Sequence, residues 1–203
     1  AGYICDEPRK EFFRYIDAAN VDLKSFSETF YWKITGAHLQ PVLETLQYLK
    51  HETDVWIELT TLLIPGENDS DEELEAMTRW VVSELGCEVP MHFTAFHPDW
   101  KMLDKPPTPA TTLTRARKIA MGNGVRYAYT GNVIDDAGGS TYCHSCGEKL
   151  IGRAQYNITR WNLDAQGKCR RCGTTCSGLF EAEQGTWGSR RLPVRLKDFE
   201  LSA

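Results

Sequence analysis

The residues of this sequence best suited to chemistry are the cysteines of two short motifs near the C-terminus. Each reads C-x-x-C-G, with Cys143 and Cys146 in the first motif and Cys169 and Cys172 in the second. Two residues between paired cysteines let both thiolates face one ion from a tight turn, and the glycine that follows can adopt a positive φ. The two motifs together offer four thiolates, a closed tetrahedral set that predicts a zinc site.

Two other uses of these cysteines stay open on the sequence alone. Four thiolates also suit iron in a rubredoxin-like site, and four cysteines also suit two disulfides in a secreted protein. We expect no signal peptide, and seven cysteines at this spacing indicate a reducing compartment. The sequence therefore favours a metal site in a cytoplasmic protein.

The overall composition limits the class of protein. A length of 203 residues fits one large or two small domains, and a hydrophobic content of 41% is ordinary for a globular core. The formal charge of −5 argues against a nucleic-acid-binding body, and no hydrophobic run is long enough to span a membrane. Phosphate-cradling loops, a nucleophile elbow and an H-E-x-x-H helix are all missing from the sequence.

The residues before the cysteine motifs alternate between strand and helix patterns. The expected strands are 18–24, 55–64, 89–96 and 125–130, and the expected helices are 6–17, one with Pro41 near its start that runs to residue 50, 71–85 and 110–122. This order and spacing are typical of parallel βα units and predict an α/β fold.

We expect this α/β fold to be followed by a smaller unit built around the cysteines. The expected boundaries are an α/β domain over 1–132, a linker over 133–140, a zinc-ribbon-like β domain over 141–180 and a loosely packed tail over 181–203.

Polar residues stand where the expected parallel strands end, which is where such sheets bind ligands. Asp22 and Lys24 close the first strand and, being two residues apart, point to the same side. Ile64 begins a Pro-Gly turn after the second strand, and His97 follows the third. Taken singly, Asp22 and Lys24 also fit a rim ion pair, and His97 also fits a loop cap. Taken together, these strand ends suit a polar, zwitterionic ligand.

Five segments of the chain resemble a known family when they are read in order. They are D-A-A-N-V-D-L-K-S-F (17–26), E-L-T-T-L-L-I-P-G-E-N-D (58–69), P-M-H-F-T-A-F-H-P-D (90–99), Y-T-G-N-V (129–133) and T-Y-C-H-S-C-G-E-K-L-I-G-R (141–153). These segments resemble radical S-adenosylmethionine (SAM) enzymes of the AmmeMemoRadiSam system, which are relatives of the pyruvate formate-lyase-activating enzymes. The resemblance covers about residues 1–180.

The resemblance implies a parallel βα partial barrel whose mouth holds a 4Fe-4S cluster and S-adenosylmethionine. Reductive cleavage of S-adenosylmethionine would give a 5′-deoxyadenosyl radical that takes hydrogen from a substrate, which the sequence does not identify. Asp22 and Lys24 resemble the D-x-K pair that contacts S-adenosylmethionine. Ile64 resembles a backbone contact near the adenine, and His97 resembles a histidine at the ribose. No residue is assigned a catalytic role.

One part of the family pattern is missing from the chain. The family holds its cluster with C-x-x-x-C-x-x-C after the first barrel strand, and this sequence contains no such motif. Cys169, Cys172 and Cys176 show the spacings of this cluster motif in reverse order. Cys169 and Cys172 are better explained as the second C-x-x-C-G motif above. We therefore expect the C-terminal part of such an enzyme, inactive alone, with an open strand edge that pairs with a chain supplying the missing strands.

A non-catalytic function is the alternative hypothesis. A zinc ribbon on a βα remnant can serve as a binding or scaffolding module, and its end of the chain is locally basic. The basic residues there are Arg153, Arg160, Lys168, Arg170, Arg171, Arg190 and Arg191. For the enzyme hypothesis the expected partners are S-adenosylmethionine and a substrate, for which a protein is one candidate class, with no membrane and no nucleic acid.

Overall fold

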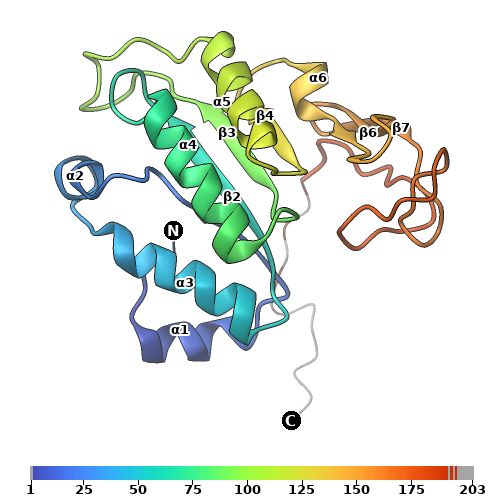
Figure 1. Ribbon diagram of the computed structural model, residues 1–203, viewed down its shortest axis with the longest axis horizontal. Coiled ribbons are helices and arrows are strands. Elements are labelled where there is room, and N and C mark those ends of the chain that lie inside the picture. The colour runs from blue at the N-terminus through green and yellow to red at the C-terminus, as the bar shows by residue number, and fades with distance from the viewer. Residues whose placement is uncertain (1, 192, 194, 196–203) are drawn as a thin grey trace.

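A sheet of four parallel strands forms the centre of the larger domain. The computed structural model describes residues 2–191, 193 and 195. The strands are β1 (Ala18–Asp22), β2 (Trp56–Leu63), β3 (Met91–Ala95) and β4 (Ala128–Gly131), and they lie in the order β1-β2-β3-β4 (Figure 1). All four pair in parallel, as the sequence predicted. β4 begins later than expected because the N–H of Val125 bonds to the end of the preceding helix, at Ala120.

Helix α1 (Asp6–Phe13) precedes β1, and the helices that follow the strands cover one face of this sheet. The latter are α2 (Glu28–Phe30) with the π-helical turn η1 (Tyr31–Thr35), α3 (Leu39–Glu52), α4 (Asp71–Trp80) with the π-helical turn η2 (Val81–Leu85), and α5 (Ala110–Gly122). Helices α3, α4 and α5 lie across the sheet in Figure 1. No helix in the described part of the chain is long and apolar enough to cross a membrane.

The expected start of α4 is confirmed in detail. Ser70 is its N-cap, and the Ser70 side chain accepts a hydrogen bond of 3.2 Å from the N–H of Glu73. Asp71, Glu72 and Glu73 fill the first turn, where their negative charges favour the positive end of the helix dipole. Gly86, with a φ of 95°, ends the helical segment after η2.

Side chains alternate between the two faces of the sheet. In β2, Ile57, Leu59, Thr61 and Leu63 are buried under the helices, while the residues between them are half-buried on the opposite face. We call that second face the open face. The strand register places on it Asn20, Asp22, Glu58, Thr60, His92, Thr94 and Tyr129. The larger domain therefore presents a polar surface on the side away from its helices.

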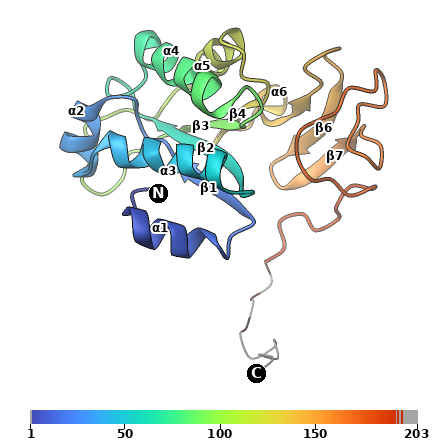
Figure 2. The same ribbon diagram turned by 60° about the horizontal axis from the view of Figure 1, so that its bottom comes forward.

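A small antiparallel sheet forms the second domain and lies beside β4 (Figure 2). Its strands are β5 (Thr141–Tyr142), β6 (Lys149–Ala154) and β7 (Asn157–Trp161). Its core contains Tyr127, Cys143, Leu150, Ile151, Leu163, Cys169 and Cys176. Because Tyr127 comes from the residues just before β4, the small core is continuous with the end of the larger domain.

The connection between the two domains is ordered. The segment 133–140, marked by composition as a linker, contains the short helix α6 (Asp136–Gly139). Asp135 caps this helix by accepting a hydrogen bond of 2.9 Å from the N–H of Gly138, and it also accepts one of 2.9 Å from the hydroxyl of Thr130. In the expected tail, 181–191 form no helix or strand, and 192, 194 and 196–203 lie outside the described residues.

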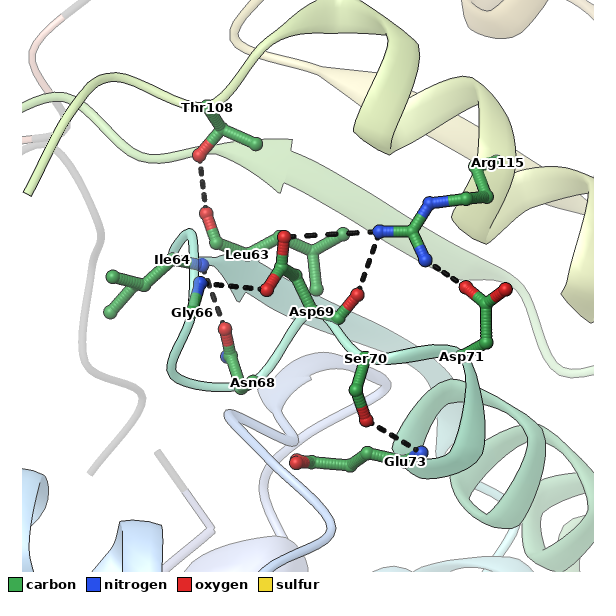
Figure 3. A network of polar contacts seen from close by, with 10 residues as sticks. All are labelled: Leu63, Ile64, Gly66, Asn68, Asp69, Ser70, Asp71, Glu73, Thr108 and Arg115. Atoms are coloured by element: carbon green, nitrogen blue, oxygen red, sulfur yellow. Dashed lines mark hydrogen bonds and ion pairs between the residues drawn. The ribbon is translucent and has the colours of Figure 1, made fainter.

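A buried amide side chain joins the ends of β1 and β2. Asn68 is fully buried, and its Oδ1 accepts a hydrogen bond of 2.7 Å from the N–H of Ile64 (Figure 3). Its Nδ2 donates to the carbonyl of Lys24 at 2.6 Å and to that of Leu62 at 2.9 Å. Three backbone groups from two strand ends thus depend on one side chain, because no water reaches them there.

We expect the substitution Asn68→Ala to lower the free energy of unfolding by about 2–4 kcal/mol, because it leaves a buried N–H without a partner and removes donors from two carbonyls. Urea unfolding followed by circular dichroism measures this change. The matched control is Asn20→Ala, which removes one hydrogen bond on an exposed surface. Equal stability losses in the two variants would contradict the assigned role of Asn68.

Candidate functional site

Asp22 and Lys24 form a charged pair at the end of β1, with the Lys24 backbone hydrogen-bonded and both side chains exposed to solvent. Nζ of Lys24 lies 3.2 Å from Oδ2 of Asp22, and the two side chains are 40% and 41% exposed. The N–H of Lys24 donates to the hydroxyl of Tyr31 at 3.1 Å, and its carbonyl accepts from Asn68. Burial raises the pKa of Tyr31 to about 12, so its hydroxyl stays neutral. The backbone is fixed on both sides, and the two charges face solvent at the sheet edge.

Ile64 and His97 lie at the same edge as this pair. In the strand register Asp22 is level with Thr60, and Leu63 is level with Ala95, so the residues that follow each strand emerge together. Ile64 is buried, and its N–H and carbonyl are both hydrogen-bonded within its own turn. His97 is exposed and makes no hydrogen bond with the described residues. Asn68 connects Lys24 with Ile64, whereas His97 stands apart.

The sequence did not indicate the side chains that fix this edge. Glu73 lies three residues after the N-cap Ser70, a spacing that suggests a capping box. Its carboxylate instead accepts hydrogen bonds from the N–H of Phe26, at 2.8 Å, and from the hydroxyl of Ser25. The loop after Lys24 is therefore tied to the first turn of α4. Sequence patterns did not predict this contact because residues 26 and 73 are far apart in the sequence.

The four cysteines of the two motifs converge in the small domain. Their sulfur atoms all lie within 4.8 Å of one another, with Cys143 to Cys172 at 3.5 Å and Cys146 to Cys169 at 3.8 Å. A tetrahedral metal with bonds to sulfur of about 2.3 Å requires sulfur atoms about 3.8 Å apart, whereas a disulfide requires about 2.05 Å. The distances fit a metal, and all four cysteines are free thiols. The arrangement could hold a metal ion through four thiolates.

Local structure prepares these thiols for a metal. Gly147 and Gly173 have φ values of 72° and 75°, as expected for glycines that close C-x-x-C turns. The hydroxyl and N–H of Thr174 lower the pKa of Cys172 to about 6, which favours its thiolate. Burial and the neighbouring thiols raise the pKa of Cys146 to about 12, so without a metal this thiol keeps its proton. Cys176 lies outside the group of four, and burial raises the pKa of its thiol.

The described residues do not fit a 4Fe-4S cluster with an open iron. Such a cluster needs three thiolates that leave one iron free for a ligand. Within the described ranges, the four cysteines of the small domain are the only group of three or more His, Cys, Asp or Glu side chains that could hold a metal. They form a closed set away from the Asp22–Lys24 edge. Cys5 and Cys87 belong to no such group.

The open face carries a second group of polar side chains. Nε2 of His92 lies 2.7 Å from Oε2 of Glu58, and Nε1 of Trp56 donates to Oε1 of Glu58 at 3.1 Å. The hydrogen bond to His92 lowers the pKa of Glu58, so the carboxylate accepts and His92 donates from Nε2. The His92 ring stacks on Tyr129 with ring centroids 5.0 Å apart. The placement of Glu58 and His92 on one face agrees with the strand alternation in the sequence.

Comparison with known sequences finds one similar curated protein. No protein-family model matches the chain. The uncharacterized protein MJ0808 of Methanocaldococcus jannaschii is 44% identical over 173 residues, which are 85% of this chain and 51% of that protein. The chain thus spans about half the length of the curated relative that it matches.

Comparison with solved structures identifies the fold. A domain of a pyruvate-formate lyase-activating enzyme from Bacteroides vulgatus aligns with a TM-score of 0.55 and 16% identity, over 63% of this chain and 75% of that one. A radical SAM methyltransferase from Sphaerobacter thermophilus aligns with a TM-score of 0.47 and 16% identity, over 55% of this chain and 32% of that one. The first alignment supports the predicted fold class, a parallel α/β sheet like that of this activating-enzyme domain.

Proposed function

We propose that this chain supplies the S-adenosylmethionine-binding edge of a radical SAM enzyme of the AmmeMemoRadiSam type. The observation that carries this proposal is the Asp22–Lys24 pair at the carboxyl end of β1, fixed by Asn68 beside the Ile64 turn. Asp22 would accept hydrogen bonds from the ligand's amino group or ribose hydroxyls, and Lys24 would pair with its carboxylate. Ile64 would lie near the adenine and His97 near the ribose.

Reductive cleavage of S-adenosylmethionine is the chemistry that a 4Fe-4S cluster supplies in such an enzyme. In this proposal the cluster is bound by residues outside this chain, because the described cysteines do not fit it. The residues of this chain bind and orient the ligand. A chain that supplies further barrel strands would pair with β1, which lies at one end of the sheet. A four-thiolate metal site needs reduced cysteines, which supports a cytoplasmic location in this proposal.

For the four-thiolate site we propose zinc in a structural role. A closed tetrahedral set leaves no position for a substrate, and zinc is the metal most often held by four cysteines in this way. Cys143 and Cys169 are themselves part of the small core, so the metal would hold together the residues around it. The metal would then contribute directly to the stability of the small domain.

A scaffolding module that binds nucleic acid or protein through its basic end is not favoured. The arginines there are engaged within the chain. Arg160 and Arg171 both pair with Glu148, at 2.5 Å and 3.5 Å, and Nε of Arg170 donates to the carbonyl of Leu163 at 2.8 Å. Glu148 thus offsets part of the positive charge of Arg160 and Arg171, and Arg170 is held against the backbone of its own domain.

Binding of S-adenosylmethionine to the chain tests the first proposal. We expect Lys24→Ala to weaken binding at least about tenfold in isothermal titration calorimetry, because a charge-assisted hydrogen bond contributes about 1.5–3 kcal/mol. Asp22→Asn should weaken binding to a similar extent. The control is Lys50→Ala, which removes an exposed lysine at the end of α3. Wild-type affinity in both Asp22→Asn and Lys24→Ala, with unchanged melting temperatures, would refute the assigned site.

Metal analysis tests the second proposal. We expect about one zinc and no acid-labile sulfide per chain, and a lower melting temperature of the small domain after chelation. Cys169→Ser should lose the zinc, since it removes a buried ligand. Cys176→Ser is the matched control, because it changes a buried cysteine outside the group and should retain the metal. Iron in place of zinc, or metal retention in Cys169→Ser, would contradict the assignment.

A further inference from the structure

One arginine of the small domain lies on the larger sheet. Arg153 belongs to β6, and its Cζ lies 5.6 Å from the centroid of the Tyr129 ring in β4. Its Nη1 donates to Oγ1 of Thr141 at 2.8 Å and to the carbonyl of Gly139 at 3.3 Å. The Tyr129 hydroxyl contacts the same Thr141 oxygen at 2.8 Å. The guanidinium is therefore held at the junction of the two domains by an aromatic ring and two hydrogen bonds.

Arg153 extends the row of polar side chains across the open face. The strand register places Tyr129 level with His92, whose ring it stacks against, and His92 is bonded to Glu58. Four strands thus contribute one side chain each to a continuous row: Glu58, His92, Tyr129 and Arg153. The pKa of Glu58 is lowered mainly by the hydrogen bond from His92, and the charge of Arg153 adds to this effect. The arginine therefore acts electrostatically on the open face.

The row has unequal capacity for further hydrogen bonds. Both oxygens of Glu58 already accept, one from His92 and one from Trp56. Among the described residues, Nε and Nη2 of Arg153 have no hydrogen-bond partner, and neither does Nδ1 of His92. Each oxygen of the Glu58 carboxylate thus has one donor, whereas the Nε–Nη2 edge of the half-buried Arg153 guanidinium has no acceptor among the described residues. A planar, two-oxygen anion matches that edge, because both of its oxygens can accept parallel N–H bonds.

We propose that the open face binds the carboxylate group of a ligand at Arg153, with Nδ1 of His92 contacting a second polar group of the same ligand. This inference rests on the proposed function only in naming the ligand as the enzyme's substrate, which would then be a carboxylate-bearing molecule. It also gives the small domain a second role. The domain that holds the metal supplies the cation of the substrate site, so its folding and ligand binding are coupled.

A titration with acetate tests this inference on the zinc-loaded chain. Side-chain ¹⁵N NMR follows Nε of Arg153 and the ring nitrogens of His92, with sodium chloride at matched ionic strength as the reference. We expect a saturable shift at Arg153 with acetate and a small, linear drift with chloride. Arg153→Gln should weaken acetate binding at least tenfold. Arg153→Lys, which keeps the charge and loses the planar pair of donors, should also weaken it.

The matched control is Arg160→Gln, which changes an exposed arginine of β7 whose partner Glu148 still pairs with Arg171. This variant should bind acetate like the unmodified chain. A linear acetate response, equal binding in Arg153→Gln and the unmodified chain, or a stronger saturable response to inorganic phosphate would overturn the proposal. S-adenosylmethionine binding by the unmodified chain is measured in parallel. If the unmodified chain binds acetate but not S-adenosylmethionine, the result would count against the proposed function and not against this site.

Discussion

The geometry of the sheet edge depends on one buried amide. Parallel strands twist relative to one another, so the ladder hydrogen bonds do not fix the positions of the residues that follow each strand. Asn68 fixes them, because its buried side chain bonds to backbone groups at the ends of both β1 and β2. Thr108 has a similar role between β2 and β3, where it donates to the carbonyl of Leu63 and accepts from the N–H of Phe96. The apolar core holds the strands, and buried polar side chains place their ends.

Local patterns in the sequence predicted the elements well and the contacts between them poorly. Ser70 and Gly86 identify the two ends of one helical segment through short-range chemistry, and both are confirmed. The start of β4 was wrong because Val125 is apolar and buried without belonging to a strand. Asp22 and Lys24 could be placed at the edge from strand spacing alone. The roles of Asn68 and Arg153 could not be predicted, since each depends on a residue far away in the sequence or in the other domain.

The two domains share more than a covalent connection. Tyr127 lies in the core of the small domain, and its hydroxyl accepts a hydrogen bond of 2.9 Å from the N–H of Ser177. Burial raises its pKa to about 12, so the phenol stays neutral beside the thiols. Tyr127 and Tyr129, which are two positions apart in the chain, therefore both contact the small domain. The metal site, the junction and the end of the parallel sheet form one continuous packed region.

The position of Thr141 limits how the two domains can move. Thr141 is the first residue of β5, and its hydroxyl oxygen contacts both Tyr129 of the large sheet and Arg153 of the small one. A rotation of the small domain would disturb the two contacts that cross to the large sheet, the Thr141–Tyr129 hydrogen bond and the packing of Arg153 on the Tyr129 ring, because both depend on Tyr129. The angle between the two sheets and the position of the cation on the open face are thus not independent variables. A change in either one requires a change in the other.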